Sequence, residues 1–134
     1  LLLGSSLLAQ PRLRLIAHRG GIVDDTHPEN TVSSLEAAIR AGYWMVEVDV
    51  RASRDGEPLL HHDATLERFF KRPERPEDLT WRELSQLRST PGGDPPFHFE
   101  QLCQLCRGRI RLMLDIKTTT LRPAFYHRLA RLMQ

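Results

Sequence analysis

Two acidic residues, Glu47 and Asp49, stand two positions apart in an otherwise apolar segment of the chain. In an extended strand they point to the same face, with Cβ atoms about 6 to 7 Å apart, while the neighbouring valines take the other face. Two carboxylates at this separation repel each other unless a cation lies between them. The pair therefore indicates a site for an ion, and the alternative is a polar strand with a solvated face.

Asp115 and Lys117 repeat this spacing within the apolar segment Leu-Met-Leu-Asp-Ile-Lys. An unpaired charge buried in such a segment would cost several kcal/mol, so both residues need a partner or a function. We predict that they belong to the functional site, and a structural ion pair is the alternative.

Two of the six histidines are candidates for proton transfer. His18 follows the apolar residues 15–17 and precedes Arg19, and His62 ends a second apolar segment. His61 points to the opposite face from His62 and is predicted to pack or to support the site, with a reactive role as the alternative. The remaining histidines are predicted to be solvated: His27, His98 and His127.

These residues lie on a chain in which strands alternate with helices. Strands are predicted at residues 12–17, 44–53, 57–63 and 109–117, and helices at residues 31–42, 79–87, 99–108 and 123–134. The first helix has a Ser-x-x-Glu capping pattern at residues 33–36 and a closing Gly42. Such alternation predicts an α/β fold of parallel strands, whose active site lies at the carboxyl ends of the strands. All four predicted strands carry ionisable residues near that end.

The composition fits one globular domain, with 134 residues, 40% hydrophobic and 27% charged. A formal net charge of +2 is too small to indicate a nucleic-acid partner. The leucine-rich residues 1–11 are predicted to be a signal-peptide remnant or a linker, and a helix, a membrane-stem remnant or translated flanking sequence are alternatives. A signal peptide would make the protein secreted or periplasmic. Beyond it, no segment approaches the roughly 20 apolar residues of a membrane span.

Cys103 and Cys106 are the only cysteines and have the spacing Cys-x-x-Cys. A second pair of metal ligands at zinc-site spacing is missing, so a structural zinc site is not expected. We predict that both pack on one face of a helix, and redox chemistry is the alternative.

The motifs together resemble the glycerophosphodiester phosphodiesterase family. In order along residues 13–117 they are His-Arg-Gly-Gly, Pro-Glu-Asn-Thr, Glu-Val-Asp, His-His-Asp with Thr-Leu-Glu-Arg, and Leu-Asp-Ile-Lys. The resemblance implies a TIM barrel with the phospholipase C-like phosphodiesterase fold. It also implies hydrolysis of glycerophosphodiesters to sn-glycerol 3-phosphate and an alcohol, with one divalent cation, Mg²⁺ or Ca²⁺.

The same resemblance assigns a role to eight residues of this chain. They are the metal ligands Glu47, Asp49 and Asp115, the acid and base His18 and His62, the phosphate-binding Arg19 and Lys117, and the supporting Glu29. Position 115 departs from the family, which usually has the longer glutamate there. The chemistry agrees, because carboxylates suit a hard cation and a guanidinium offers paired donors to a phosphate.

A complete TIM barrel has eight strands and about 250 residues, whereas four strands are predicted here. We therefore expect residues 12–134 to form the N-terminal part of the catalytic domain, about the first four βα units. Such a fragment could be inactive alone and serve as a non-enzymatic interaction module, and a lysophospholipase D-like relative is another alternative. The expected partner is a small-molecule glycerophosphodiester; membrane contact stays open and is not indicated.

Overall fold

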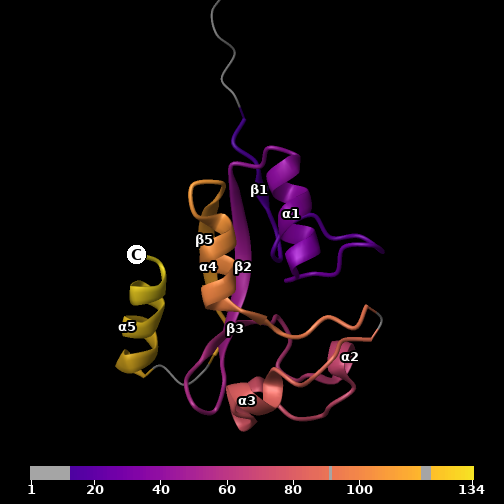
Figure 1. Ribbon diagram of the computed structural model, residues 1–134, viewed down its shortest axis with the longest axis vertical. Helices are drawn as coiled ribbons and strands as arrows, with labels where there is room; N and C mark the ends of the chain where they lie inside the picture. The colour runs from indigo at the N-terminus through magenta and orange to yellow at the C-terminus, as the bar shows by residue number, and fades with distance from the viewer. Residues whose placement is uncertain (1–12, 91, 119–121) are drawn as a thin grey trace, which may run out of the picture.

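The structure, a computed structural model, describes residues 13–90, 92–118 and 122–134 (Figure 1). The predicted signal-peptide remnant or linker at residues 1–11 lies outside the described residues. One sheet forms the centre of the molecule, and its strands are β1 (Ile16–Ala17), β2 (Met45–Ala52), β3 (Pro58–Leu60), β4 (Phe97–His98) and β5 (Arg111–Ile116). Hydrogen bonds join them in the order β1-β2-β3-β4, and β5 pairs with β2.

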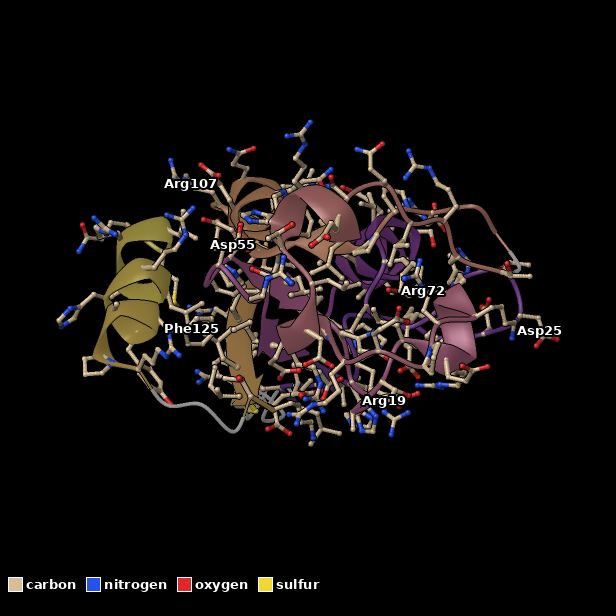
Figure 2. The ribbon with its side chains drawn as sticks, turned by 90° about the horizontal axis from the view of Figure 1, so that it is seen from below. Arg19, Asp25, Asp55, Arg72, Arg107 and Phe125 are labelled. Carbon is tan, nitrogen blue, oxygen red and sulfur yellow. The ribbon has the colours of Figure 1, made fainter. Side chains whose placement is uncertain are left out.

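The parallel part of the sheet consists of β1, β2 and β5. Ile16 is opposite Met45 in the β1–β2 pair, and Asp49 is opposite Asp115 in the β2–β5 pair. The valines of β2 are fully buried and belong to the main hydrophobic core, together with side chains from α1 (Val32–Arg40), α4 (Phe99–Cys106) and α5 (Pro123–Leu132). Phe125, for example, points from α5 toward the sheet (Figure 2). Side chains alternate along a strand, so burial of the valines fixes Glu47 and Asp49 on the opposite face.

The prediction of a third parallel strand at residues 57–63 is wrong in direction and length. β3 runs antiparallel to β2, with Val50 opposite Leu60 and Ala52 opposite Pro58. Only residues 53–57 connect the two strands, and a parallel connection needs a crossover of a dozen or more residues. The described chain thus contributes three parallel strands, not four, and the return of β3 along β2 carries His61 and His62 back toward Asp49.

The predicted helices are present, although their ends differ. Thr31 caps α1 in a capping box with Ser34, so the predicted Ser-x-x-Glu cap two residues later is wrong. Residues 79–87 form only the short α3 (Trp81–Leu84), and the sequence did not predict α2 (Glu67–Phe70), β4 or a 3-10 helix η1 (Pro76–Asp78). In Figure 1, α2 and α3 lie together at the lower end of the sheet.

The two cysteines lie on the buried face of α4, as predicted. Cys103 and Cys106 are free and only 7% and 3% exposed. Burial raises the pKa of the Cys103 thiol to about 11 and that of Cys106 to about 12. Thiols in this state are protonated and behave as small apolar side chains.

Across residues 13–90, 92–118 and 122–134, every helix is too short or too polar to cross a lipid bilayer.

Candidate active site

The turn after β1 brings the His-Arg-Gly-Gly motif against the middle of β2. The backbone N–H of Arg19 donates to Oε2 of Glu47 at 2.9 Å, and that of Gly20 donates to the Glu47 carbonyl at 2.7 Å. Arg19 has a φ of 54°, which is uncommon for a residue with a side chain. Its carbonyl accepts from the Asn30 N–H at 2.8 Å. Two hydrogen bonds of the Arg19 backbone and one of the Gly20 backbone therefore hold Arg19 in a conformation that it would rarely adopt alone.

Three carboxylates meet where β2 pairs with β5: two come from the middle of β2 and one from the carboxyl end of β5. Glu47, Asp49 and Asp115 each offer an oxygen, and the three oxygens lie within 4.8 Å of one another. Asp49 is 1% exposed, and its Oδ2 accepts a hydrogen bond of 3.0 Å from the Asn30 amide. Its Oδ1 is buried, with no hydrogen-bond partner in the part of the chain that the structure describes.

A buried carboxylate oxygen without a hydrogen bond is costly unless a cation compensates its charge. The Lys117 ammonium lies 2.7 Å from Oδ2 of Asp115 and 3.5 Å from Oδ1 of Asp49. Its hydrogen bond to Asp115 raises the pKa of Lys117 against the effect of burial, and the charge of Asp49 adds to the increase. One ammonium for three carboxylates leaves net negative charge, and this all-oxygen donor set fits a hard divalent cation.

The two candidate histidines have different surroundings. The His18 side chain is 73% exposed, with Nε2 3.7 Å from Oε2 of Glu47. His62 is more enclosed: its Nδ1 lies 2.9 Å from Oδ1 of Asp63, and its Nε2 lies 3.2 Å from Nη2 of Arg19. A guanidinium can only donate, so Nε2 of His62 accepts and Nδ1 carries the proton that is donated to Asp63.

Glu29 contacts both Arg19 and Arg68, whereas the family resemblance indicated only a supporting role for it. Its side chain is 7% exposed and lies 3.0 Å from Nη1 of Arg19. Burial would raise the pKa of Glu29, but hydrogen bonds from Arg68 and Arg19 outweigh burial and hold this pKa below its usual value. Glu29 is therefore a carboxylate that fixes the guanidinium of Arg19.

The other histidines take no direct part in this arrangement. His61 is 4% exposed, its Nε2 lies 2.8 Å from the Thr65 carbonyl, and burial lowers its pKa. It packs, as predicted. The prediction that His98 is solvated is wrong, because its ring lies 4.5 Å from that of Trp81 and its Nε2 lies 3.3 Å from Glu57.

Residues 22–27 form the part of the β1–α1 loop that lies between the two motifs. Asp24 accepts hydrogen bonds from Thr26 and His27, which lower its pKa to about 2. His27 is thereby paired rather than fully solvated, with Nδ1 2.8 Å from Oδ1 of Asp24. Asp25 lies at the outer end of this loop, well apart from Arg19 (Figure 2).

Sequence reasoning missed the contributions of Asn30, Arg51 and Arg68. The Arg51 side chain is 8% exposed, pairs with Glu77 at 3.2 Å, and donates to the backbone carbonyls of His62 (3.1 Å) and Lys117 (3.3 Å). A cation two positions after Asp49, on the same face of β2, was the available indication. Arg68 belongs to the Thr-Leu-Glu-Arg motif, but the family resemblance assigned no role to it.

The fold and site define a class: part of a TIM barrel in which a carboxylate cluster, an arginine and two histidines lie together on and beside the parallel strands. The profile of the Glycerophosphoryl diester phosphodiesterase family matches residues 18–126. The chain belongs to this family, which confirms the resemblance and the barrel fold.

Relatives with known names are consistent with this assignment. Mouse glycerophosphodiester phosphodiesterase 1 is 31% identical over 120 residues, which are 83% of this chain and 36% of the mouse protein. A crystal structure of a glycerophosphoryl diester phosphodiesterase from Parabacteroides distasonis is 31% identical, with a TM-score of 0.74, over 94% of this chain and 45% of that one. An Oleispira antarctica phosphodiesterase in complex with the product sn-glycerol-3-phosphate is 30% identical, with a TM-score of 0.68, over 77% of this chain and 44% of that one. The chain thus spans less than half the length of each.

Proposed function

We propose that the protein hydrolyses glycerophosphodiesters to sn-glycerol 3-phosphate and an alcohol, with one divalent cation bound by Glu47, Asp49 and Asp115. The observation that carries the proposal is the cluster of three carboxylates, Glu47, Asp49 and Asp115, whose oxygens lie within 4.8 Å of one another and have one ammonium, that of Lys117, to compensate them. Family membership and the named product of the Oleispira antarctica relative support the same reaction.

Arg19 and Lys117 are the proposed phosphate-binding residues. The Arg19 side chain is 32% exposed, and Glu29 holds Nη1 of its guanidinium, so a ligand can be reached by Nη2 when that ligand replaces the contact of Nη2 with His62. A guanidinium offers paired N–H donors that match two phosphate oxygens, and the Lys117 ammonium adds a point charge. Together they compensate the negative charge of the diester.

His18 and His62 are the proposed acid and base. One imidazole removes a proton from the attacking oxygen, and the other gives a proton to the leaving alkoxide. Nε2 of His18 lies 3.7 Å from Glu47, and Nδ1 of His62 lies 2.9 Å from Asp63, so a carboxylate stands beside each imidazole and can orient it.

The carboxylate cluster gives the site its metal preference. A divalent cation there would supply positive charge to a nonbridging oxygen of the phosphate. Carboxylate oxygens suit both Mg²⁺ and Ca²⁺. Asp115 is 49% exposed and one methylene shorter than the glutamate usual in the family, so we propose that it is the weakest of the three ligands.

The test is ³¹P NMR of glycerophosphocholine and of lysophosphatidylcholine, each incubated with the full-length protein and Mg²⁺ or Ca²⁺. We expect sn-glycerol 3-phosphate from glycerophosphocholine, and no product in excess chelator. Cleavage of lysophosphatidylcholine alone would favour the lysophospholipase D-like alternative. If neither substrate is consumed, the proposal is refuted and the non-enzymatic interaction module is favoured.

We further propose that residues 12–134 belong to one catalytic domain and that residues 1–11 are a signal-peptide remnant or a linker. A secreted or periplasmic location follows from the first of these two options for residues 1–11. Cell fractionation, with sequencing of the mature N-terminus, would test it.

A further inference from the structure

Five side chains near the site form a closed ring of hydrogen bonds. Arg68 contacts Glu29 and Asp63, Glu29 contacts Arg19, Asp63 contacts His62, and Arg19 and His62 contact each other. The family resemblance gave roles to Arg19, Glu29 and His62 and none to Asp63 or Arg68. Arg68 joins the two carboxylates of the ring, although it lies 39 residues from Glu29 in the sequence.

Arg68 makes four of the hydrogen bonds in this ring. Its Nε and Nη2 donate to the two oxygens of Asp63 at 2.6 and 2.9 Å. Its Nη1 and Nη2 donate to the two oxygens of Glu29 at 3.2 and 2.5 Å. Its Cζ lies 4.3 Å from the centre of the Phe69 ring, which further restricts the side chain. The planar guanidinium thus fixes two carboxylates at once, which a lysine ammonium cannot do with the same geometry.

The electrostatics of the ring differ from those of an ordinary surface ion pair. An exposed pair contributes little because both side chains must be ordered to form it. Here Glu29 is already ordered by Arg19, and Asp63 by His62. Burial would raise the pKa of Asp63, but hydrogen bonds from Arg68 and His62 outweigh it and hold that pKa below its usual value. Both carboxylates therefore stay charged and remain acceptors for the groups beyond them.

One contact of the ring, between Arg19 and His62, would have to break when a substrate binds. Nε2 of His62 contacts Arg19, yet the same nitrogen and the same guanidinium would act on the phosphodiester. When a phosphate takes the place of this contact, Asp63 still orients His62 through Nδ1 and Glu29 still orients Arg19. Arg68 holds these two carboxylates at a fixed separation from each other.

We propose that Arg68 is a positioning residue. Through Asp63 and Glu29 it holds the side chains of His62 and Arg19 in a fixed position relative to each other. The inference rests on the proposed function, since His62 and Arg19 are taken as the groups that act on the diester. It predicts that loss of Arg68 lowers the rate of turnover, and also weakens the preference of His62 for a proton on Nδ1.

The test compares Arg68→Gln and Arg68→Lys with the control Arg72→Gln in the full-length protein. Arg72 is a matched control because its side chain is also 44% exposed and also pairs twice with a carboxylate, that of Glu74, outside the ring. We expect Arg68→Gln to lower kcat for glycerophosphocholine about 10- to 100-fold with a smaller change in KM. Arg68→Lys should recover part of the loss, and Arg72→Gln should stay within about twofold of the parent.

A second measurement does not depend on activity. ¹⁵N NMR of the His62 imidazole reports which ring nitrogen carries the proton, and we expect the Nδ1–H form in the parent and a mixture in Arg68→Gln. An unchanged His62 spectrum in Arg68→Gln and Arg68→Lys would overturn the inference, whatever happens to kcat, because Arg68 would then act elsewhere. If the parent is active and Arg68→Gln has the same kcat as the parent, the inference is also overturned. If the parent hydrolyses no diester, the proposed function fails and the His62 spectrum alone decides the inference.

Discussion

Gly21 is the position at which a single methyl group should disturb both the fold and the site. Its φ is 151°, and a Cβ built there would lie 2.0 Å from the Ser34 carbonyl oxygen and 2.7 Å from the Leu35 nitrogen. Both atoms belong to the backbone of the first turns of α1, so no side-chain rotation can relieve the contact. Gly21→Ala must therefore move α1 away from the turn that carries His18 and Arg19.

The cost follows from this geometry. The contact must open by about 1 Å, from 2.0 Å to the 3.0 Å below which real Cβ contacts are essentially absent. Overpacking of this kind costs about 1 to 3 kcal/mol, and the unfavourable backbone region about 1 to 2 kcal/mol more. Gly42→Ala is the control: its φ is 75°, and its Cβ would meet no described atom within 4 Å. Gly42→Ala should therefore lose only the stability that the unfavourable backbone region costs, about 1 to 2 kcal/mol.

Thermal and urea unfolding of both variants measures the difference. A loss of 1 kcal/mol lowers Tm by roughly 2 to 4 °C in a protein of 150 to 250 residues. We expect Gly21→Ala to melt roughly 2 to 12 °C below Gly42→Ala, and to bind sn-glycerol 3-phosphate more weakly. Equal melting temperatures for the two variants would refute the packing argument.

Three further predictions test the proposed residues. Glu47→Gln should weaken binding of Mg²⁺ or Ca²⁺ in isothermal titration calorimetry, because one ligand charge is lost from the cluster; undiminished affinity would contradict a metal site there. His62→Ala should lower kcat by several powers of ten and His61→Ala far less, because His61 is buried and bonded to a backbone carbonyl; steady-state kinetics that show equal losses would mean that His61 is the reactive histidine. Cys103 and Cys106, with pKa values raised to about 11 and 12, should not react with a disulfide reagent at pH 8 until the protein is unfolded in urea; rapid labelling of the native protein would contradict their burial.

The sequence by itself determined the features that depend on local periodicity and on short-range chemistry. Alternation placed Glu47 and Asp49 on one face of β2, because successive side chains of a strand point in opposite directions. A closing glycine marked the end of α1, and a proline marked the start of α5. The motif residues were identifiable because their types and order are specific. None of this required knowledge of which segments lie side by side.

Only the tertiary structure decided burial and partners. The antiparallel direction of β3 does not belong to this group, because the short connection between the two predicted strands already excludes a parallel crossover. Asp49 is 1% exposed because it lies within the sheet, opposite Asp115 of β5, with the Asn30 amide bonded to its Oδ2. Arg68 joins Glu29 to Asp63 because α2, which carries Arg68, lies against the segment before α1 that carries Glu29. Contacts between such distant segments depend on how the whole chain packs, which local residue patterns do not encode.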